Sequence, residues 1–110
     1  DLVRSRGLGD VYKRQVYYGE LFNIYGSLLN ESNRKFYKLY YEENFTLQEI
    51  ADLEKVSKSY VGNIINKTSK KLKEYESKLH IYESKRKLEE ILFFDNINQI
   101  KNSIKEVIEF

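Results

Sequence analysis

The sequence contains no cysteine, proline, methionine or tryptophan, and it has a single histidine. Without cysteine the chain has no disulfide framework and no thiolate that could bind a metal or act as a nucleophile. A single histidine excludes a metal site built from several histidines, and we expect neither a metal nor another cofactor. The absence of proline, together with only five glycines, favours helix throughout.

Long apolar runs are also missing, and none approaches the length of a membrane-spanning helix. With no secretory leader visible, we expect a cytoplasmic protein. The 110 residues are enough for one domain with a modest core, to which ten tyrosines and six phenylalanines can contribute. The composition therefore predicts a small all-α protein.

The net charge of +2 is too small to indicate a nucleic-acid partner, but its distribution is informative. Residues 42–54 contain five acidic side chains and no basic one, whereas residues 55–73 contain six lysines and no acidic side chain. The acids Glu42, Glu43, Asp52 and Glu54 have no defined ligand spacing, so we interpret them as a solvated helix end rather than a metal site. The lysines predict one positive helix face.

The charge changes sign within residues 46–68, which have the pattern of two short amphipathic helices joined by a tight turn. Thr46 can cap the first helix and Glu49 completes a capping box, while Ser57 can cap the second helix. We expect the following residues to face inward: Leu47, Ile50, Ala51, Leu53, Val61, Ile64 and Ile65. This pattern predicts a helix-turn-helix, in which the second helix enters a DNA groove.

The alternative for this segment is a plain αα-hairpin within a helical core. Turns of helix-turn-helix motifs often hold a glycine in the left-handed conformation, and here Lys55 is expected at that position. A non-glycine residue there costs on the order of 1 kcal/mol, which is tolerable.

The rest of the chain divides into three parts by pattern. Residues 1–15 lack a helical period and are interpreted as a non-native or disordered leader, although their basic residues could instead form an arm that contacts DNA. Residues 16–84 are predicted to form the helix-turn-helix domain, with helices near 16–29 and 31–42 before the motif. Residues 85–110 are expected to form a C-terminal helical extension.

No stop signal follows the motif, so residues 57–84 are predicted to form one helix of about 40 Å. Its apolar residues recur at spacings of four and three, as in a helix that packs along one partner. The late part of this seam is longer than a small core needs, which predicts a homodimer interface formed by Leu72, Tyr75, Leu79 and Tyr82. The C-terminal helices of the same chain could cover the seam instead.

Across residues 17–82 the sequence resembles the YlxM-type helix-turn-helix proteins, which are small bacterial proteins similar to region 4 of sigma factors. The residues that carry the resemblance are Tyr25-Gly26-Ser27-Leu28-Leu29, Leu39-Tyr40-Tyr41, Glu49-Ile50-Ala51, Val56-Ser57, Val61, Ile64 and Tyr75-Glu76-x-Lys78-Leu79. The resemblance implies a sigma region 4-like fold and a DNA-binding regulatory role. Because the family's genes typically lie beside signal recognition particle genes, it also implies components of that particle as candidate partners.

The start of the second helix departs from the family pattern. Members usually show S-R-x-A-V there, and this chain has Ser57-Lys58-Ser59-Tyr60-Val61. Lysine keeps the positive charge of arginine but lacks the bidentate fork that reads base edges.

If the second helix enters the major groove, its exposed residues would contact DNA. Asn63 could pair with an adenine edge, and Tyr60 could reach a phosphate or a thymine methyl group. Lys58, at the positive end of the helix, is suited to a phosphate. The complete predicted DNA-binding set is Lys58, Ser59, Tyr60, Asn63, Lys67, Lys70 and Lys71, of which the last two would contact only the DNA backbone.

Two classes of function remain open from the sequence. In the first, the protein is a DNA-binding regulator; in the second, the same fold is a protein-interaction module that binds signal recognition particle or transcription machinery. Binding to DNA that weakens with salt would favour the first class, and partner binding that survives loss of the lysines would favour the second. His80 has no companion nucleophile, so we do not expect an enzyme.

Overall fold

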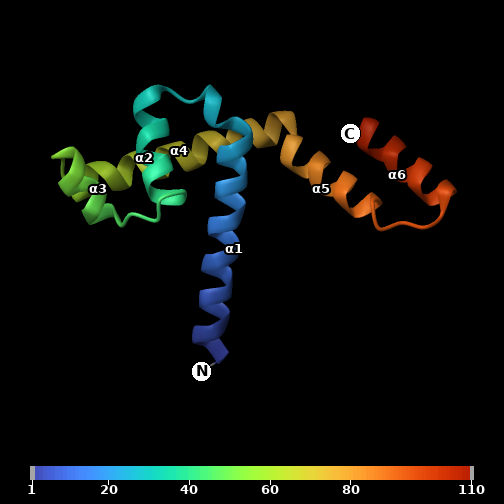
Figure 1. Ribbon diagram of the computed structural model, residues 1–110, viewed down its shortest axis with the longest axis horizontal. Coiled ribbons are helices and arrows are strands. Elements are labelled where there is room, and N and C mark those ends of the chain that lie inside the picture. The colour runs from blue at the N-terminus through green and yellow to red at the C-terminus, as the bar shows by residue number, and fades with distance from the viewer. Residues whose placement is uncertain (1, 110) are drawn as a thin grey trace.

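The protein is helical throughout the part that the computed structural model describes, which is residues 2–109, with side chains from residue 13 onward. The elements are α1 (Leu2–Tyr25), a 3-10 turn η1 (Gly26–Leu28), α2 (Glu31–Tyr41), α3 (Leu47–Glu54), α4 (Lys58–Leu79), α5 (Ile81–Ile91) and α6 (Ile97–Ile108). In Figure 1, α2, α3, α4 and the C-terminal end of α1 form one body, from which the rest of α1 projects, and α5 and α6 extend away from it on one side. No strand occurs in residues 2–109, and the all-α, helix-turn-helix prediction with C-terminal helices is confirmed.

Helix α1 begins at Leu2, inside the segment that we predicted to be a leader. Residue 1 and the side chains of residues 2–12 lie outside the description. The prediction about residues 1–15, including the alternative of a basic arm, therefore stays a prediction. The same holds for the domain boundaries at residues 84 and 85.

The core forms where α1, α2 and α3 meet α4. Its largest fully buried side chains include Tyr25 and Tyr37, so aromatic residues fill volume that aliphatic residues fill in most small bundles. Leu28, which falls within the helix predicted near residues 16–29, is 53% exposed, because α1 ends at Tyr25 and the chain tightens into η1. The buried core residues are Tyr18, Leu21, Phe22, Tyr25, Leu29, Phe36, Tyr37, Ile50, Ala51, Val61, Ile65 and Leu72.

The helix-turn-helix has the predicted caps. Thr46 Oγ1 accepts a hydrogen bond from the Glu49 amide at 3.1 Å, and Glu49 Oε1 accepts one from the Thr46 amide at 3.2 Å. Ser57 Oγ accepts from the Tyr60 amide at 3.0 Å, which caps α4. Lys55 adopts the left-handed conformation, with φ 57°. These contacts fix the turn between α3 and α4.

One predicted core residue of the motif is misplaced. Leu53 is 55% exposed, whereas Ile50 and Ala51 are buried. At about 100° per residue, Leu53 lies about 60° from Ile50 and about 160° from Ala51, so it sits at the edge of the buried face rather than at its centre.

The predicted single helix over residues 57–84 is wrong, because α4 ends at Leu79. His80 adopts the left-handed conformation, with φ 55°, and α5 starts at Ile81 in a new direction. This break moves Tyr82 from the end of the expected helix into the first turn of α5.

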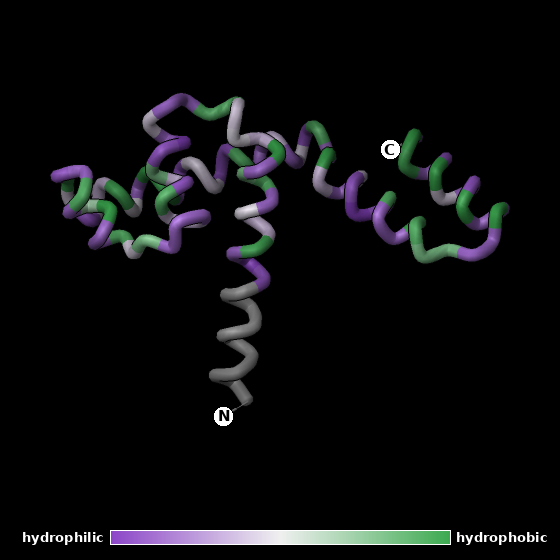
Figure 2. The backbone as a smooth tube through the Cα atoms, in the orientation of Figure 1, coloured by the Kyte–Doolittle hydropathy of each residue, from purple (hydrophilic) through white to green (hydrophobic). Residues whose placement is uncertain are grey.

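The helices α5 and α6 form a hairpin, in which α6 runs back alongside α5 (Figure 1). Asn96 caps α6 by accepting a hydrogen bond from the Gln99 amide at 3.1 Å. No residue of α6 is buried, and Figure 2 shows hydrophobic positions recurring along both helices of the hairpin. Among the helices described, none combines the length and apolar character needed to span a membrane.

Candidate nucleic-acid interface

The helices α3 and α4 are held in a fixed relation by contacts with α2. The Tyr37 hydroxyl and Ser69 Oγ are hydrogen-bonded at 2.8 Å in the core between α2 and α4. Lys35 on α2 forms an ion pair with Glu54 on α3, with 2.9 Å between Nζ and Oε1. Both helices of the motif therefore contact α2, in addition to being joined by their turn.

The face of α4 that points away from the core is polar and positively charged. Ser59, Asn63, Lys67 and Lys70 recur at spacings of four, four and three, and all four are exposed. The opposite side of the helix contains Val61 and the other buried residues. The structure therefore brings these four predicted residues together on one surface, about 16 Å long at 1.5 Å per residue.

Asn66 belongs to the same surface and was not predicted. It is exposed and lies three residues after Asn63 and four before Lys70. The helical spacing that selected Asn63 and Lys67 would have selected Asn66 as well.

Three predicted residues lie outside this outward face. The Tyr60 ring packs edge-on against Phe36 of α2 with 6.1 Å between ring centroids, and its side chain is about half exposed. Lys71, eleven residues later, lies on the same flank of α4 by helical geometry. Lys58 lies on the other flank, beside α3.

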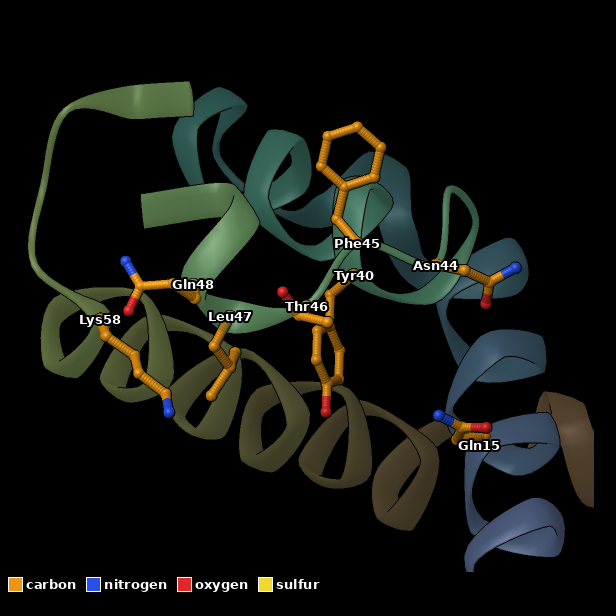
Figure 3. Close-up of a pocket in the computed structure, with 8 residues that line it drawn as sticks. All are labelled: Gln15, Tyr40, Asn44, Phe45, Thr46, Leu47, Gln48 and Lys58. Carbon is orange, nitrogen blue, oxygen red and sulfur yellow. The ribbon is translucent and has the colours of Figure 1, made fainter. Parts of the chain in front are cut away.

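A shallow hollow adjoins Lys58 on the α3 side. Its volume is about 380 Å³, and Figure 3 shows Lys58 near Leu47 and Gln48 of α3, with Gln15 of α1 at the far end. The Lys58 ammonium and the Gln48 amide are two hydrogen-bond donors at the start of the two helices of the motif. Donors at this place suit a DNA phosphate.

The acids that precede α4 are engaged in local contacts. Glu54 pairs with Lys35, and Asp52 accepts a hydrogen bond from the Gln48 amide at 2.9 Å. Glu42, Glu43 and Asp52 are exposed, as expected for a solvated helix end.

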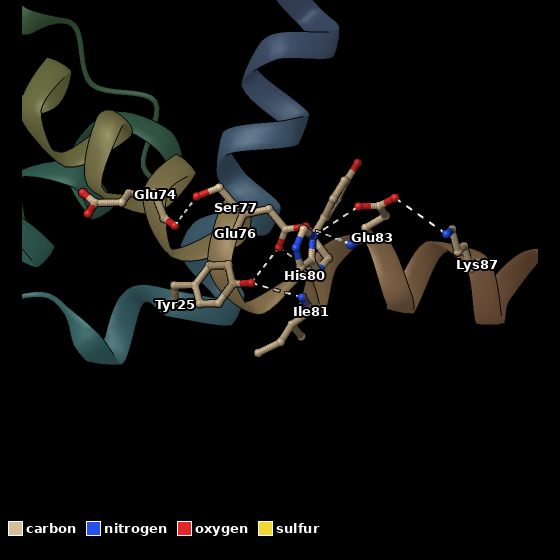
Figure 4. A network of polar contacts seen from close by, with 9 residues as sticks. Tyr25, Glu74, Glu76, Ser77, His80, Ile81, Glu83 and Lys87 are labelled. Atoms are coloured by element: carbon tan, nitrogen blue, oxygen red, sulfur yellow. Dashed lines mark hydrogen bonds and ion pairs between the residues drawn. The ribbon is translucent and has the colours of Figure 1, made fainter. Parts of the chain in front are cut away.

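A buried polar network connects α1, α4 and α5 (Figure 4). Glu76 Oε1 accepts hydrogen bonds from the Tyr25 hydroxyl at 2.6 Å and from the Tyr82 amide at 3.0 Å, and Oε2 accepts one from the Glu83 amide at 3.1 Å. The Tyr25 oxygen accepts from the Ile81 amide at 3.2 Å. Glu76 thus caps the N-terminus of α5. Burial is the main cause, and the hydrogen bond to Glu76 the second cause, of a raised pKa of about 12 for Tyr25.

His80 lies beside this network as a flanking histidine. Its Nδ1 is 3.5 Å from Glu83 Oε2, and the ligand atoms of Glu76, His80 and Glu83 lie within 4.8 Å of one another. Such a group could hold a metal ion, but the Glu76 carboxylate already receives three hydrogen bonds. Capping of α5 accounts for the position of Glu76.

Two residues of the predicted dimer seam contact α1 of the same chain, and a third is buried in the core. Leu72 has no exposed surface, Tyr75 packs against Tyr25, and Tyr82 packs edge-on against Tyr17 with 5.0 Å between ring centroids. Of the four predicted interface residues only Leu79, at 52%, is largely exposed. Leu72 is therefore buried within its own chain, Tyr75 and Tyr82 are half-buried, and the dimer interface along this seam stays a prediction.

Comparison with known proteins agrees with this geometry. Residues 12–109 match the model of the UPF0122 family, described as "Putative helix-turn-helix protein, YlxM / p13 like". A UPF0122 protein of Mycoplasma capricolum is 39% identical over 94 residues, which cover 81% of this chain and 83% of the relative. A UPF0122 protein of Halalkalibacterium halodurans is 44% identical over 72 residues, which cover 66% of each chain. The family match includes α5 and α6 and so extends beyond residues 17–82, over which the resemblance was recognised from the sequence.

Proposed function

Because the chain belongs to the YlxM/p13-like helix-turn-helix family, we propose that it is a DNA-binding regulatory protein in which α4 enters the major groove. The observation that supports the proposal is the outward face of α4. Between residues 59 and 70 its exposed residues are Ser59, Asn63, Asn66, Lys67 and Lys70, and the first acidic side chain on this face is Glu74, one turn later, which pairs with Lys78. A plain αα-hairpin of a core does not need such a face.

The proposal assigns separate roles to the residues of α3 and α4. Asn63, in the middle of the outward face, would pair with an adenine edge through two hydrogen bonds. Lys67 and Lys70 would contact phosphates farther along the groove wall. On the flanks, Lys58 with Gln48 would contact one DNA strand, and Tyr60 with Lys71 the other. Phosphate contacts of this kind set the register of the protein on the duplex.

The choice of lysine over arginine has a consequence for binding. A lysine ammonium acts as a point charge and lacks the rigid planar fork with which arginine matches a base edge. Most of the affinity would then come from phosphate contacts and counterion release, so binding should depend steeply on salt. A role in the signal recognition particle pathway rests on the family resemblance alone and stays a prediction.

A salt titration of duplex binding tests the proposal. In the variant Lys67→Gln/Lys70→Gln, the slope of log affinity against log salt should fall by about 0.9 for each lost phosphate contact. The matched control is Lys101→Gln/Lys105→Gln, which removes the same charge from exposed positions on α6. Helical circular dichroism should be unchanged in both variants.

Two outcomes would overturn the proposal. One is a wild-type protein that is not retained on duplex DNA at low salt. The other is equal loss of affinity in the α4 variant and the α6 control, which would assign the binding to net charge rather than to the outward face of α4.

A further inference from the structure

The hairpin of α5 and α6 exposes two matched apolar stripes. On α5 and its C-cap the stripe is Ile81, Leu88 and Leu92, and on α6 it is Ile97, Ile104 and Ile108. Both stripes have spacings of seven and four residues. Their exposed fractions range from 38% for Ile104 to 83% for Leu92. Phe93, 86% exposed, lies next to Leu92 at the end of the hairpin.

The two stripes lie on one face of the hairpin. Each residue rotates about 100° around the helix axis. Viewed along α5, the side chains of Leu88 and Leu92 are therefore rotated by about 60° and 100° in the same direction from that of the buried Ile91. Viewed along α6, the side chains of Ile97 and Ile104 are rotated by about 60° and 40° from that of the half-buried Ile100, in the same direction as on α5. Because the helices run antiparallel, the same sense of rotation brings both stripes to the same side.

The other face of the hairpin is polar, which supports this assignment. A hollow of about 200 Å³ between the two helices is lined mostly by charged and polar side chains. These lie on the opposite rotational side of Ile91 and Ile100 from the stripes. They are Lys87, Glu90, Ser103 and Glu106. We call the face with the two stripes the apolar face of the hairpin.

The described part of the chain does not cover the apolar face. Helix α6 packs against α5 and against no other described element to a comparable extent. A fully exposed aliphatic side chain presents roughly 100 Å² of apolar surface, so the stripes and Phe93 together present on the order of 400 Å². The largest apolar patch of a typical monomer is about 300–600 Å² and is often functional, so an apolar face of this size is a candidate docking surface.

We propose that the apolar face docks against the same face of a second copy of this chain, which gives a two-fold dimer joined by a four-helix bundle. The matched stripes make the face self-complementary, as an isologous interface requires. Seven-residue spacing is typical of helices that pack along one another in bundles. The apolar surface also has the right size, because each partner of a standard interface contributes about 800 Å², somewhat over half of it apolar.

The charge of the hairpin favours a second copy over a lipid or nucleic-acid surface. Residues 81–109 contain five basic and six acidic side chains, so the hairpin has almost no net charge. A lipid surface with anionic headgroups would select an excess of basic residues around the apolar stripe. Two copies of a nearly neutral hairpin can associate without repulsion.

Sedimentation equilibrium between about 1 and 100 μM tests the dimer. We expect the wild-type protein to dimerise in this range and Leu92→Glu/Ile108→Glu to be a monomer with unchanged helical circular dichroism. The control Asn98→Glu/Asn102→Glu adds the same charge at exposed positions of α6 outside the stripe and should remain a dimer. A wild-type monomer at 100 μM, or a dimer that survives both stripe substitutions, overturns the proposal.

The absence of cysteine gives a second readout that does not depend on a charged substitution. In Leu92→Cys the rate of thiol alkylation should fall several-fold as protein concentration rises into the dimer range, whereas in Asn98→Cys the rate should be constant. Alkylation of Leu92→Cys that is independent of concentration would contradict the proposed interface.

Discussion

The Tyr25 hydroxyl donates a 2.6 Å hydrogen bond to Oε1 of Glu76 and joins residues 51 positions apart in the sequence. Tyr25 ends α1, and Glu76 lies in the last turns of α4. The same two side chains accept the free amides of Ile81, Tyr82 and Glu83 at the start of α5. This network, together with the Tyr17–Tyr82 ring contact, therefore helps to set the direction in which the C-terminal hairpin leaves the body.

Replacing Tyr25 with phenylalanine should lower the free energy of unfolding by about 1–3 kcal/mol. The substitution removes a donor to the buried Glu76 carboxylate and leaves the Ile81 amide without its acceptor. Urea denaturation measures the change. Tyr75→Phe is the matched control, since its ring contacts Tyr25 but its hydroxyl is in no hydrogen bond among the described residues. Equal stability of the two variants would mean that the Tyr25 network contributes little.

Stability should fall at alkaline pH between about 10 and 12. Burial raises the pKa of Tyr25 to about 12, whereas an unfolded tyrosine titrates near 10. In that interval the unfolded chain has lost the proton and the folded chain still holds it, so the free energy of unfolding decreases as the pH rises. Urea titrations at several pH values should show a shallower decrease in Tyr25→Phe. An unchanged decrease would assign the effect to other tyrosines, such as Tyr37, whose pKa is also raised by burial.

Replacing Thr68 with valine should stabilise the protein. The Thr68 side chain is fully buried in α4, and its Oγ1 has no hydrogen-bond partner among the described residues. Valine has nearly the same shape and removes the unsatisfied hydroxyl, which should raise the free energy of unfolding by about 1 kcal/mol. Ser69→Ala is the contrasting variant and should destabilise, because Ser69 bonds the Tyr37 hydroxyl. Destabilisation by Thr68→Val would show that the hydroxyl is satisfied in solution.

Asn63→Ala should relax base discrimination at one position of a preferred DNA site by about 1–3 kcal/mol. Competition binding with single-base variants of the site measures the discrimination. Asn98→Ala on α6 is the control and should bind like the wild type. If Asn63→Ala weakened binding equally to preferred and random duplexes, Asn63 would contact the DNA backbone rather than a base.

The sequence alone determined the helix-turn-helix. The motif is defined by two capping contacts, Thr46 with Glu49 and Ser57 with Tyr60, and by the left-handed conformation of Lys55. Each cap joins residues three positions apart, and the conformation of Lys55 involves one residue. Such local features can be recognised from residue type and spacing. The outward face of α4 follows from helical periodicity in the same way.

The tertiary structure decided where α4 ends and which apolar stripe stays uncovered. Periodicity continues through His80, and no local signal marks a stop there. The helix ends there because the side chains of Tyr25 and Glu76 accept hydrogen bonds from the first amides of α5. These two residues are 51 positions apart in the sequence. Leu72 is buried in the core and Tyr75 packs against Tyr25 of α1, whereas large apolar side chains of the α5–α6 hairpin stay exposed. Contacts between residues so distant in sequence form only when the chain is folded, and spacing along one helix contains no information about them.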